Sequence, residues 1–198
     1  LPYDPAAPPA EQVAQSLASS LEHLRTDHVD SFLLHGPSLP DRFSGADLEA
    51  WRAMDEQRRA GRTRLIGVSN VSRPHLEELL AGAGPLPAIV QNRCRARTGW
   101  DREVRAFCRT HGIGYQAFSL LTAHGRELAA SAVAGIARRL GRTLPQVVFR
   151  FALQLGMIPL TGTTDPVHMR EDLACFEFSL AGEDLDVLEG SVHANRAV

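Results

Sequence analysis

Lysine is absent from this chain of 198 residues, in which all 21 basic residues counted as Lys+Arg are arginine. Any reaction step that requires a lysine therefore needs one from outside this sequence. Tyrosine is scarce as well: Tyr3 lies in the lead-in segment and Tyr115 lies inside a predicted strand. Because the chain begins at Leu1 rather than at a methionine, we expect that upstream residues were removed or are not represented.

The sequence also lacks a strong charge bias, a long apolar run and a paired set of cysteines. A formal net charge of -2 with both signs interspersed offers no basic field for a phosphate backbone, so we expect no nucleic-acid partner. No apolar run approaches the roughly 18–20 residues that cross a bilayer, so we expect no membrane association. The cysteines show no metal-ligand spacing and predict reduced buried thiols, no metal site and a cytoplasmic location. They are Cys94, Cys108 and Cys175.

Short apolar runs alternate with helical patterns along the chain, and each run predicts a strand. The strands are expected at residues 29–35, 63–69, 88–92, 113–118 and 157–161. The helices are expected after Pro9, from Leu48, from Ser72, from Asp101, in two pieces broken at Gly141 and Pro145, and from about Ala181. The length suits one hydrophobic core, which predicts a single domain over residues 1–198.

Strands that alternate with helices of roughly 10–15 residues are typical of an α/β fold with a parallel sheet. A Rossmann fold is the competing architecture, but no G-x-G-x-x-G follows any predicted strand. In a closed TIM-type barrel the reactive groups lie at the carboxyl ends of the strands. Polar residues occur at those ends, namely His35, Ser69, Asn70, Gln91, Ser119 and residues 161–164.

Read in order, these strand ends resemble motifs of the aldo-keto reductase family. Residues 20–24 (SLEHL) and 27–35 (DHVDSFLLH) are similar to its S-L-x-x-L segment and to the strand that ends in its catalytic histidine. Residues 61–70 (GRTRLIGVSN) are similar to its G-K-x-R-x-I-G-V-S-N signature, with Arg62 in place of the lysine. The resemblance extends over nearly the whole chain, and the order and spacing of its motifs make it specific.

The resemblance implies a TIM-type (β/α)8 barrel, represented here by about five strands, the fourth to the eighth, without the first three. It implies reduction of an aldehyde or ketone by hydride transfer from NAD(P)H. In the family a tyrosine donates the proton, and a lysine paired with an aspartate lowers the pKa of that tyrosine. Neither Tyr3 nor Tyr115 matches this position, so the tyrosine, lysine and aspartate are expected upstream of the chain.

Four positions match family residues near the reacting atoms. His35 would orient the substrate carbonyl, although a histidine after a strand is, taken alone, more often a structural hydrogen-bonding group. Ser69, Asn70 and Gln91 would hold the nicotinamide carboxamide, a planar group with one donor and one acceptor side. The alternative is that these polar residues only form hydrogen bonds with the backbone of the neighbouring loops.

Two further segments match the rest of the cofactor site. Phe118, in AFSLL against the family's A-Y-S-P-L, would stack on the nicotinamide ring, and Ser119 and Leu121 would lie along the pyrophosphate. Residues 158–166 resemble the family's I-P-G-T-S phosphate loop, in which Asp165 would cap a helix that begins at Pro166. The loop would hold phosphate through Gly162, Thr163 and Thr164.

The helix after this loop bears on the choice of cofactor. His168 stands where the family often has an arginine for the 2'-phosphate, and Asp172 replaces an asparagine that faces adenine. Glu171 lies in MREDL, close to the family's R-E-N. The resemblance implies NADP(H) in preference to NAD(H). The departures at His168 and Asp172 leave both cofactors open.

A second hypothesis is a non-catalytic barrel remnant that binds nucleotide or a protein partner. Five strands of an eight-stranded barrel leave two open edges, which would drive self-association. Binding of cofactor without reduction of a small-molecule carbonyl substrate would favour the remnant over the enzyme.

Overall fold

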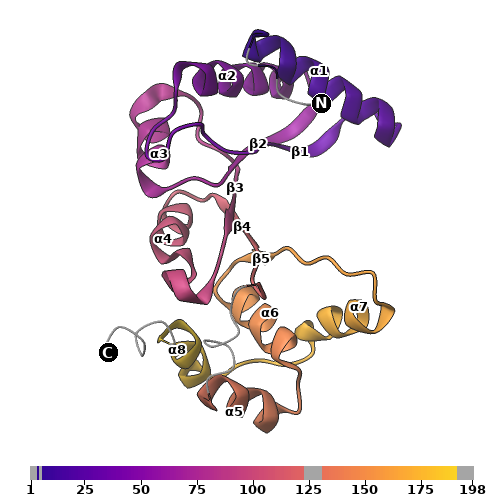
Figure 1. The fold of residues 1–198 in the computed structure, drawn as a ribbon, viewed down its shortest axis with the longest axis vertical. Coiled ribbons are helices and arrows are strands. Elements are labelled where there is room, and N and C mark those ends of the chain that lie inside the picture. Colours follow the sequence, from indigo (N-terminus) through magenta and orange to yellow (C-terminus); the bar gives the residue numbers. More distant parts are fainter. Residues whose placement is uncertain (1–3, 5, 123–130, 191–198) are drawn as a thin grey trace. The chain divides into compact units, whose positions relative to one another are not determined.

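The computed structural model describes residue 4, residues 6–122 and residues 131–190 of the chain (Figure 1). Contacts divide the chain into two compact units, Leu1–Gln91 with Ala106–Gly114, and Asn92–Arg105 with Tyr115–Val198. Tyr3 lies outside the described residues. The expected α/β class with parallel strands is confirmed, whereas a single domain over 1–198 stays a prediction.

The first unit contains three parallel strands with helices between them. Its elements are α1 (Pro9–Leu24), β1 (Val29–Leu34), α2 (Gly45–Arg59), β2 (Thr63–Ser69), α3 (Arg73–Glu78), the π-helical turn η1 (Leu79–Ala83) and most of β3 (Ile89–Arg93). β2 pairs with β1 and with β3, so that Gly67 faces Leu33 on one side and Ile89 on the other. The helices α1 and α2 pack against each other, and α2 also contacts β1 and β2 (Figure 1).

The second unit is built on one parallel strand pair and several helices. Its elements are the 3-10 helix η2 (Ala96–Asp101), the start of α4 (Arg102–Thr110), β4 (Gly114–Phe118) from Tyr115 onward, α5 (Ser131–Leu140), α6 (Leu144–Gln154), β5 (Ile158–Pro159), α7 (Pro166–Leu173), η3 (Ala174–Phe176) and α8 (Gly182–Gly190). β4 and β5 run parallel, with Ala117 paired to Pro159. The predicted break at Gly141 and Pro145 is confirmed, because the helical stretch is divided into α5 and α6 there.

Capping residues determine where the best-defined helices begin. Ser44 and Asp47 form a reciprocal capping box, in which the Ser44 side chain accepts from the Asp47 N-H and the Asp47 carboxylate accepts from the Ser44 N-H. The helix expected from Leu48 therefore begins at Gly45. Thr143 and Gln146 cap α6 in the same way.

Strand β1 is less buried than its apolar sequence predicts. Its residues are half-buried apart from Asp30, which is exposed, so this apolar run does not form a fully buried strand. Within the first unit β1 pairs only with β2 among the described residues. Its other edge has no strand partner there, and the apolar side chains keep part of their surface in solvent.

Each unit has its own set of fully buried large side chains. In the first unit these are Leu17, Trp51, Met54, Val68, His75, Leu76, Leu79 and Val90. In the second unit they are Trp100, Leu120, Phe151 and Leu188. All three cysteines are buried and free, as predicted. No helix among the described residues is long and apolar enough to cross a membrane.

Candidate functional site

The first unit brings four of the predicted site residues together at the carboxyl ends of three adjacent strands. His35 follows β1 directly, Ser69 and Asn70 lie at the end of β2, and Gln91 lies in β3 opposite Ser69. Parallel strands end at the same edge of a sheet, so their register alone makes these residues neighbours.

Hydrogen bonds lock these strand ends to one another. The Asn70 side-chain amide donates to the His35 carbonyl oxygen at 2.8 Å and to the Ser69 hydroxyl oxygen at 3.2 Å. The Ser69 hydroxyl donates to the Gln91 carbonyl oxygen at 2.6 Å, and the Asn70 backbone N-H donates to the same oxygen at 3.1 Å. Asn70 therefore fixes the backbone position from which the His35 side chain projects.

Two backbone features make this arrangement possible. Asn70 adopts a left-handed conformation with φ 54°, which asparagine tolerates better than most residues. Gly36 passes close to the end of β2, where an added Cβ would lie 3.3 Å from the Ser69 carbonyl oxygen and 3.4 Å from the Asn70 Cβ. A side chain at residue 36 would push the His35 loop away from Asn70.

The four residues differ in how accessible their side chains are. His35 is exposed, Gln91 is half-buried, and Ser69 is buried at 3% exposure. The Ser69 hydroxyl and the Asn70 amide already serve the strand ends. This favours a positioning role for these two residues, and their assigned contact with a nicotinamide carboxamide stays a prediction.

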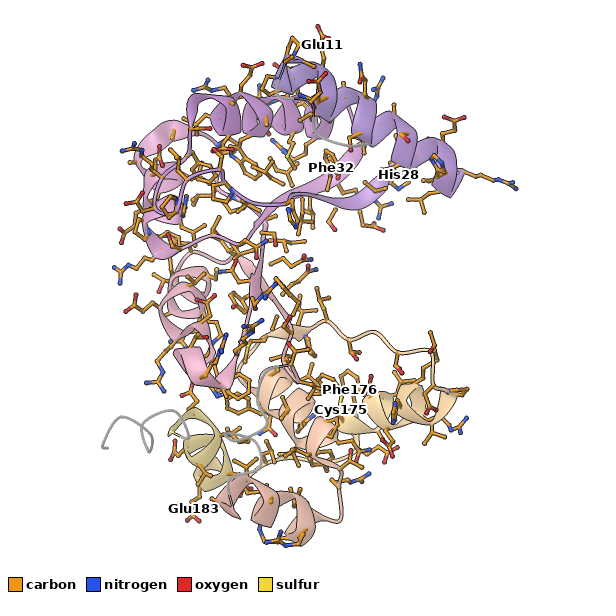
Figure 2. The ribbon with its side chains drawn as sticks, in the orientation of Figure 1. Glu11, His28, Phe32, Cys175, Phe176 and Glu183 are labelled. Atoms are coloured by element: carbon orange, nitrogen blue, oxygen red, sulfur yellow. The ribbon has the colours of Figure 1, made fainter. Side chains whose placement is uncertain are left out.

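A cavity of about 670 Å³ borders His35 within the first unit. Its walls come from α1, the outer part of β1 and α2, and Phe32 of β1 lines it (Figure 2). Apolar side chains supply much of the wall, including Val13, Leu34, Ala50 and Met54. Residues 32–34 of β1 border this cavity, so part of the surface of β1 faces open space.

The second unit holds the predicted residues for the nicotinamide ring face. Phe118 ends β4 and is half-buried, and the Arg93 guanidinium carbon lies 5.5 Å from its ring centroid. Ser119 turns the chain with φ 60°, and its carbonyl oxygen accepts from the Thr122 N-H at 3.2 Å. Leu121 follows with 39% of its surface exposed. A flat ring presented at a strand end is suited to stacking with an aromatic heterocycle.

The predicted phosphate loop lies at the same edge of this strand pair. The Asp165 side chain caps α7 by accepting from the Val167 N-H at 2.7 Å, and Pro166 occupies the first helical turn, as predicted. The Asp165 N-H in turn donates to the Thr163 hydroxyl oxygen at 3.1 Å. Gly162 and Thr164 are exposed, and an added Cβ at Gly162 would meet nothing within 4 Å. The loop thus has open space in front of a helix N-terminus, although one N-H of that terminus is already satisfied.

The three residues of α7 with predicted cofactor roles differ in their hydrogen bonds and ion pairs. His168 is 62% exposed at its side chain and lies 3.9 Å from an Asp165 carboxylate oxygen. Asp172 accepts from the Thr161 hydroxyl at 2.8 Å, and the Glu171 carbonyl oxygen accepts from the Gln146 side chain at 3.1 Å. Acidic groups therefore outnumber cations here, which makes this end a weak receptor for a 2'-phosphate.

Tyr115 belongs to a buried polar cluster and is not available as a proton donor. Its hydroxyl donates to the Asp101 carboxylate at 2.6 Å, and the Asn92 side chain donates to the same oxygen at 2.8 Å. Burial, then the neighbouring Cys94 and Asp101, raise the pKa of Tyr115. Burial also raises the pKa of Cys94, to about 12, so the thiol stays protonated at neutral pH. These groups hold η2 against β4.

Sequence reasoning missed an arginine comb at the end of β3, formed by Arg93, Arg95 and Arg97. The signal was present as arginine at every second position directly after a predicted strand.

No group of three or more potential ligands that could hold a metal ion occurs among His, Cys, Asp and Glu of the described residues.

Known proteins resemble this chain in sequence. The sequence profile of the Aldo/keto reductase family matches residues 8–192. The chain is 34% identical over 179 residues to 2,5-diketo-D-gluconic acid reductase B of Corynebacterium sp., covering 90% of this chain and 63% of that protein. It is 31% identical over 179 residues to glyoxal reductase of Bacillus subtilis, covering 90% and 62%.

Solved structures agree with the sequence comparison. An aldo-keto reductase of the silkworm Bombyx mori, complexed with NADPH, matches with a TM-score of 0.82 and 28% identity over 96% of this chain and 62% of that one. The chain spans 61–63% of the length of four curated relatives, all reductases or oxidoreductases. Since the profile covers nearly all of the sequence, the chain belongs to the aldo/keto reductase family.

Proposed function

We propose that this chain is the larger part of an NAD(P)H-dependent reductase that transfers hydride to small aldehydes or ketones. The observation that carries the proposal is the fixed group at the ends of β1, β2 and β3, where Asn70 holds the backbone of an exposed His35 at 2.8 Å. An imidazole anchored in this way can donate a hydrogen bond to a carbonyl oxygen and orient it for hydride attack.

The cofactor role divides between the two groups of residues. Gln91, with Ser69 and Asn70 behind it, would hold the nicotinamide carboxamide. Phe118 would cover the ring face, with Ser119 and Leu121 along the pyrophosphate and residues 162–164 on a phosphate. This assignment rests on the family match and on the positions of these residues in the strands or in the segments that follow them.

The proton donor has to come from elsewhere in the polypeptide. The chain has no lysine and its described tyrosine is buried against Asp101, so we propose that the catalytic tyrosine, lysine and aspartate precede it. The five strands would then be the fourth to the eighth of a (β/α)8 barrel. The proposal is consistent with a chain that spans 61–63% of its relatives. The buried free thiols suit a reducing compartment, and a cytoplasmic location is proposed with it.

Replacing His35 tests the proposal in the complete polypeptide. We expect His35→Ala to lower kcat for a reactive aromatic aldehyde on the order of 100-fold, because a positioned donor to the carbonyl oxygen is lost. NADPH affinity, followed by cofactor fluorescence, should change less than twofold or so, since His35 contacts the carbonyl and not the cofactor. His28→Ala, at a half-buried histidine near the start of β1, is the matched control. An unchanged kcat in His35→Ala would remove His35 from the reaction.

Cofactor preference provides a second test, at His168. We propose NADP(H) over NAD(H), with a weak preference because Asp165 lies near this position. His168→Arg adds a permanent cation that can pair with a 2'-phosphate, and we expect NADPH affinity to rise on the order of tenfold. NADH, which has no 2'-phosphate, is the internal control, and its affinity should stay unchanged. An equal gain for both cofactors would place the 2'-phosphate elsewhere.

A second candidate function is a nucleotide-binding or protein-binding remnant without catalysis. The open edge of β1, beside the cavity lined by Phe32, favours it, because an unpaired strand edge can accept a strand from another copy or another protein. Cofactor binding without turnover in the complete polypeptide, together with concentration-dependent association, would support this candidate over the reductase.

A further inference from the structure

The arginine comb consists of three arginines of the second unit: Arg93 at the end of β3, Arg95 in the connection and Arg97 in the first turn of η2. Exposure alternates strictly along residues 92–97: Asn92, Cys94 and Ala96 are buried, whereas the arginines are exposed or half-buried. The backbone is extended at Arg95, with φ -123° and ψ 144°. Alternate residues of an extended chain point to one side at a spacing of about 7 Å, which puts Arg93 and Arg95 on the same side. Arg97 follows in the first turn of η2, and the charges of Arg93 and Arg97 both act on Arg95.

The comb has no counter-charge among the described residues. None of its arginines forms an ion pair with a carboxylate there, whereas Arg105, on the following helix, pairs with Glu189 at 2.7 Å. The Arg95 Nε is buried and has no hydrogen-bond partner in the described structure. Burial, and then the charges of Arg93 and Arg97, lower the pKa of Arg95. Three cations held together in a chain of net charge -2 are a local reversal of its charge.

The opposite face of the same segment explains why the comb keeps its position. Asn92 donates to Asp101, the Cys94 Sγ lies 3.3 Å from the Trp100 carbonyl oxygen, and the Cys94 N-H donates to the Phe118 carbonyl oxygen at 3.0 Å. These bonds tie the segment to β4 and η2. Like charges that would otherwise move apart are therefore fixed on one rigid backbone.

The comb lies directly beside the proposed nicotinamide platform. Arg93 is stacked over the Phe118 ring at 5.5 Å from its centroid, on the strand end that would face the reacting carbon. Guanidinium groups bind carboxylates and phosphates through paired N-H donors. An anionic group on a substrate that lies against the Phe118 ring would be close to Arg93.

We propose that Arg93, Arg95 and Arg97 form an anion-binding subsite that selects carbonyl substrates carrying a carboxylate or a similar anionic group. The proposal rests on the proposed reductase function for its catalytic consequence. The anion binding itself is a property of the chain that can be measured without turnover.

The catalytic arm uses the complete polypeptide and two aldehydes that differ only in charge, 4-formylbenzoate and its methyl ester. We expect kcat/KM for the anion to exceed that for the ester on the order of tenfold, as one desolvated arginine-carboxylate interaction provides. In the R93Q/R95Q/R97Q variant this ratio should fall to about one, while kcat/KM for the ester changes less than about threefold. The R42Q/R52Q/R109Q variant removes the same charge at exposed arginines outside the comb and should keep the wild-type ratio.

The binding arm uses the 198-residue chain itself. Ligand-observed NMR titration with 4-formylbenzoate should give saturable binding that weakens at least about tenfold in the comb variant, with the ester binding equally in both. Circular dichroism checks that the variant is folded. If it is not, the R93K/R95K/R97K variant, which keeps three cations, replaces it and should bind with intermediate affinity because lysine lacks the paired donors.

The outcomes separate this proposal from the reductase proposal. If neither aldehyde is reduced, the reductase function fails, and the binding arm alone decides the subsite. If both aldehydes are reduced and the comb variant keeps the wild-type ratio, the subsite is overturned. A tenfold loss of NADPH affinity in the comb variant with an unchanged aldehyde ratio also overturns it, because the anion would then be a phosphate of the cofactor.

Discussion

Trp100→Ala is expected to destabilise the chain by about 3–5 kcal/mol, the cost of truncating a fully buried aromatic side chain. The indole of Trp100 is 0% exposed and packs against the Phe151 ring at 5.1 Å between centroids. Its Nε1 donates to the Leu188 carbonyl oxygen at 2.9 Å, which attaches α8 to η2. Loss of the indole leaves a cavity and removes this hydrogen bond between η2 and α8.

The measurement is urea unfolding of the 198-residue chain, followed by fluorescence and circular dichroism. Circular dichroism follows the variant's transition, while Trp51, the other tryptophan, reports on the first unit. Trp100→Phe keeps a ring against Phe151 and loses the N-H, so it should cost only about 1–2 kcal/mol. A loss below about 1 kcal/mol for Trp100→Ala would show that α8 and η2 hold together without the indole.

The same residue shows where sequence reasoning stops. Gly99, Trp100 and Asp101 all have positive φ, and nothing in the pattern of residues 96–101 predicts left-handed backbone at a tryptophan. The conformation follows from long-range contacts, since Trp100 binds Leu188 and Asp101 binds Tyr115. Local rules describe a turn here, and only the packed unit shows why it has this form.

Strand positions and helix starts were predictable because their causes are local. The run 63–69 is β2 with the predicted bounds, and Asp165 with Pro166 starts α7 as the capping rule requires. The start of α2 was misplaced because the Ser44 and Asp47 capping box lies outside the apolar periodicity that marked Leu48. Periodicity locates the buried face of a helix, whereas its first residue depends on the cap.

The close placement of the candidate residues in the first unit could be predicted from the sequence, whereas their hydrogen bonds could not. That His35 and Asn70 follow two parallel strands, and that Gln91 lies in the next one, could be inferred from order alone. That Asn70 donates to the His35 carbonyl depends on the register of β1 against β2, with Leu34 opposite Val68, and on the close approach of Gly36. The positive charge of the arginine comb can be seen in the sequence. Its lack of a counter-charge among the described residues becomes visible only in the structure.

Gly67→Ala is expected to destabilise the chain by about 3 kcal/mol, at the upper end of the cost of overpacking. Gly67 lies in the middle of β2 between Leu33 and Ile89, and an added Cβ would lie 2.6 Å from the Ile89 carbonyl oxygen. It would also lie 3.1 Å from the Ile89 Cβ and from the Leu33 Cγ. The closest atom is backbone, so relief requires that β2 and β3 move apart, which would weaken the ladder that aligns Ser69 with Gln91.

Gly114→Ala is the matched control for this prediction. Gly114 is the first residue of β4 and, like Gly67, has no positive φ. Its added Cβ would meet the Ala88 carbonyl oxygen at 3.5 Å, an ordinary contact. We expect its free energy of unfolding in urea to change by less than about 1 kcal/mol. Since Gly67→Ala also displaces the end of β2, the complete polypeptide carrying it should lose aldehyde reduction under conditions in which the variant is still folded. Equal stabilities of the two alanine variants would mean that β2 and β3 have room to separate, and that the strand-end group around His35 does not depend on their spacing.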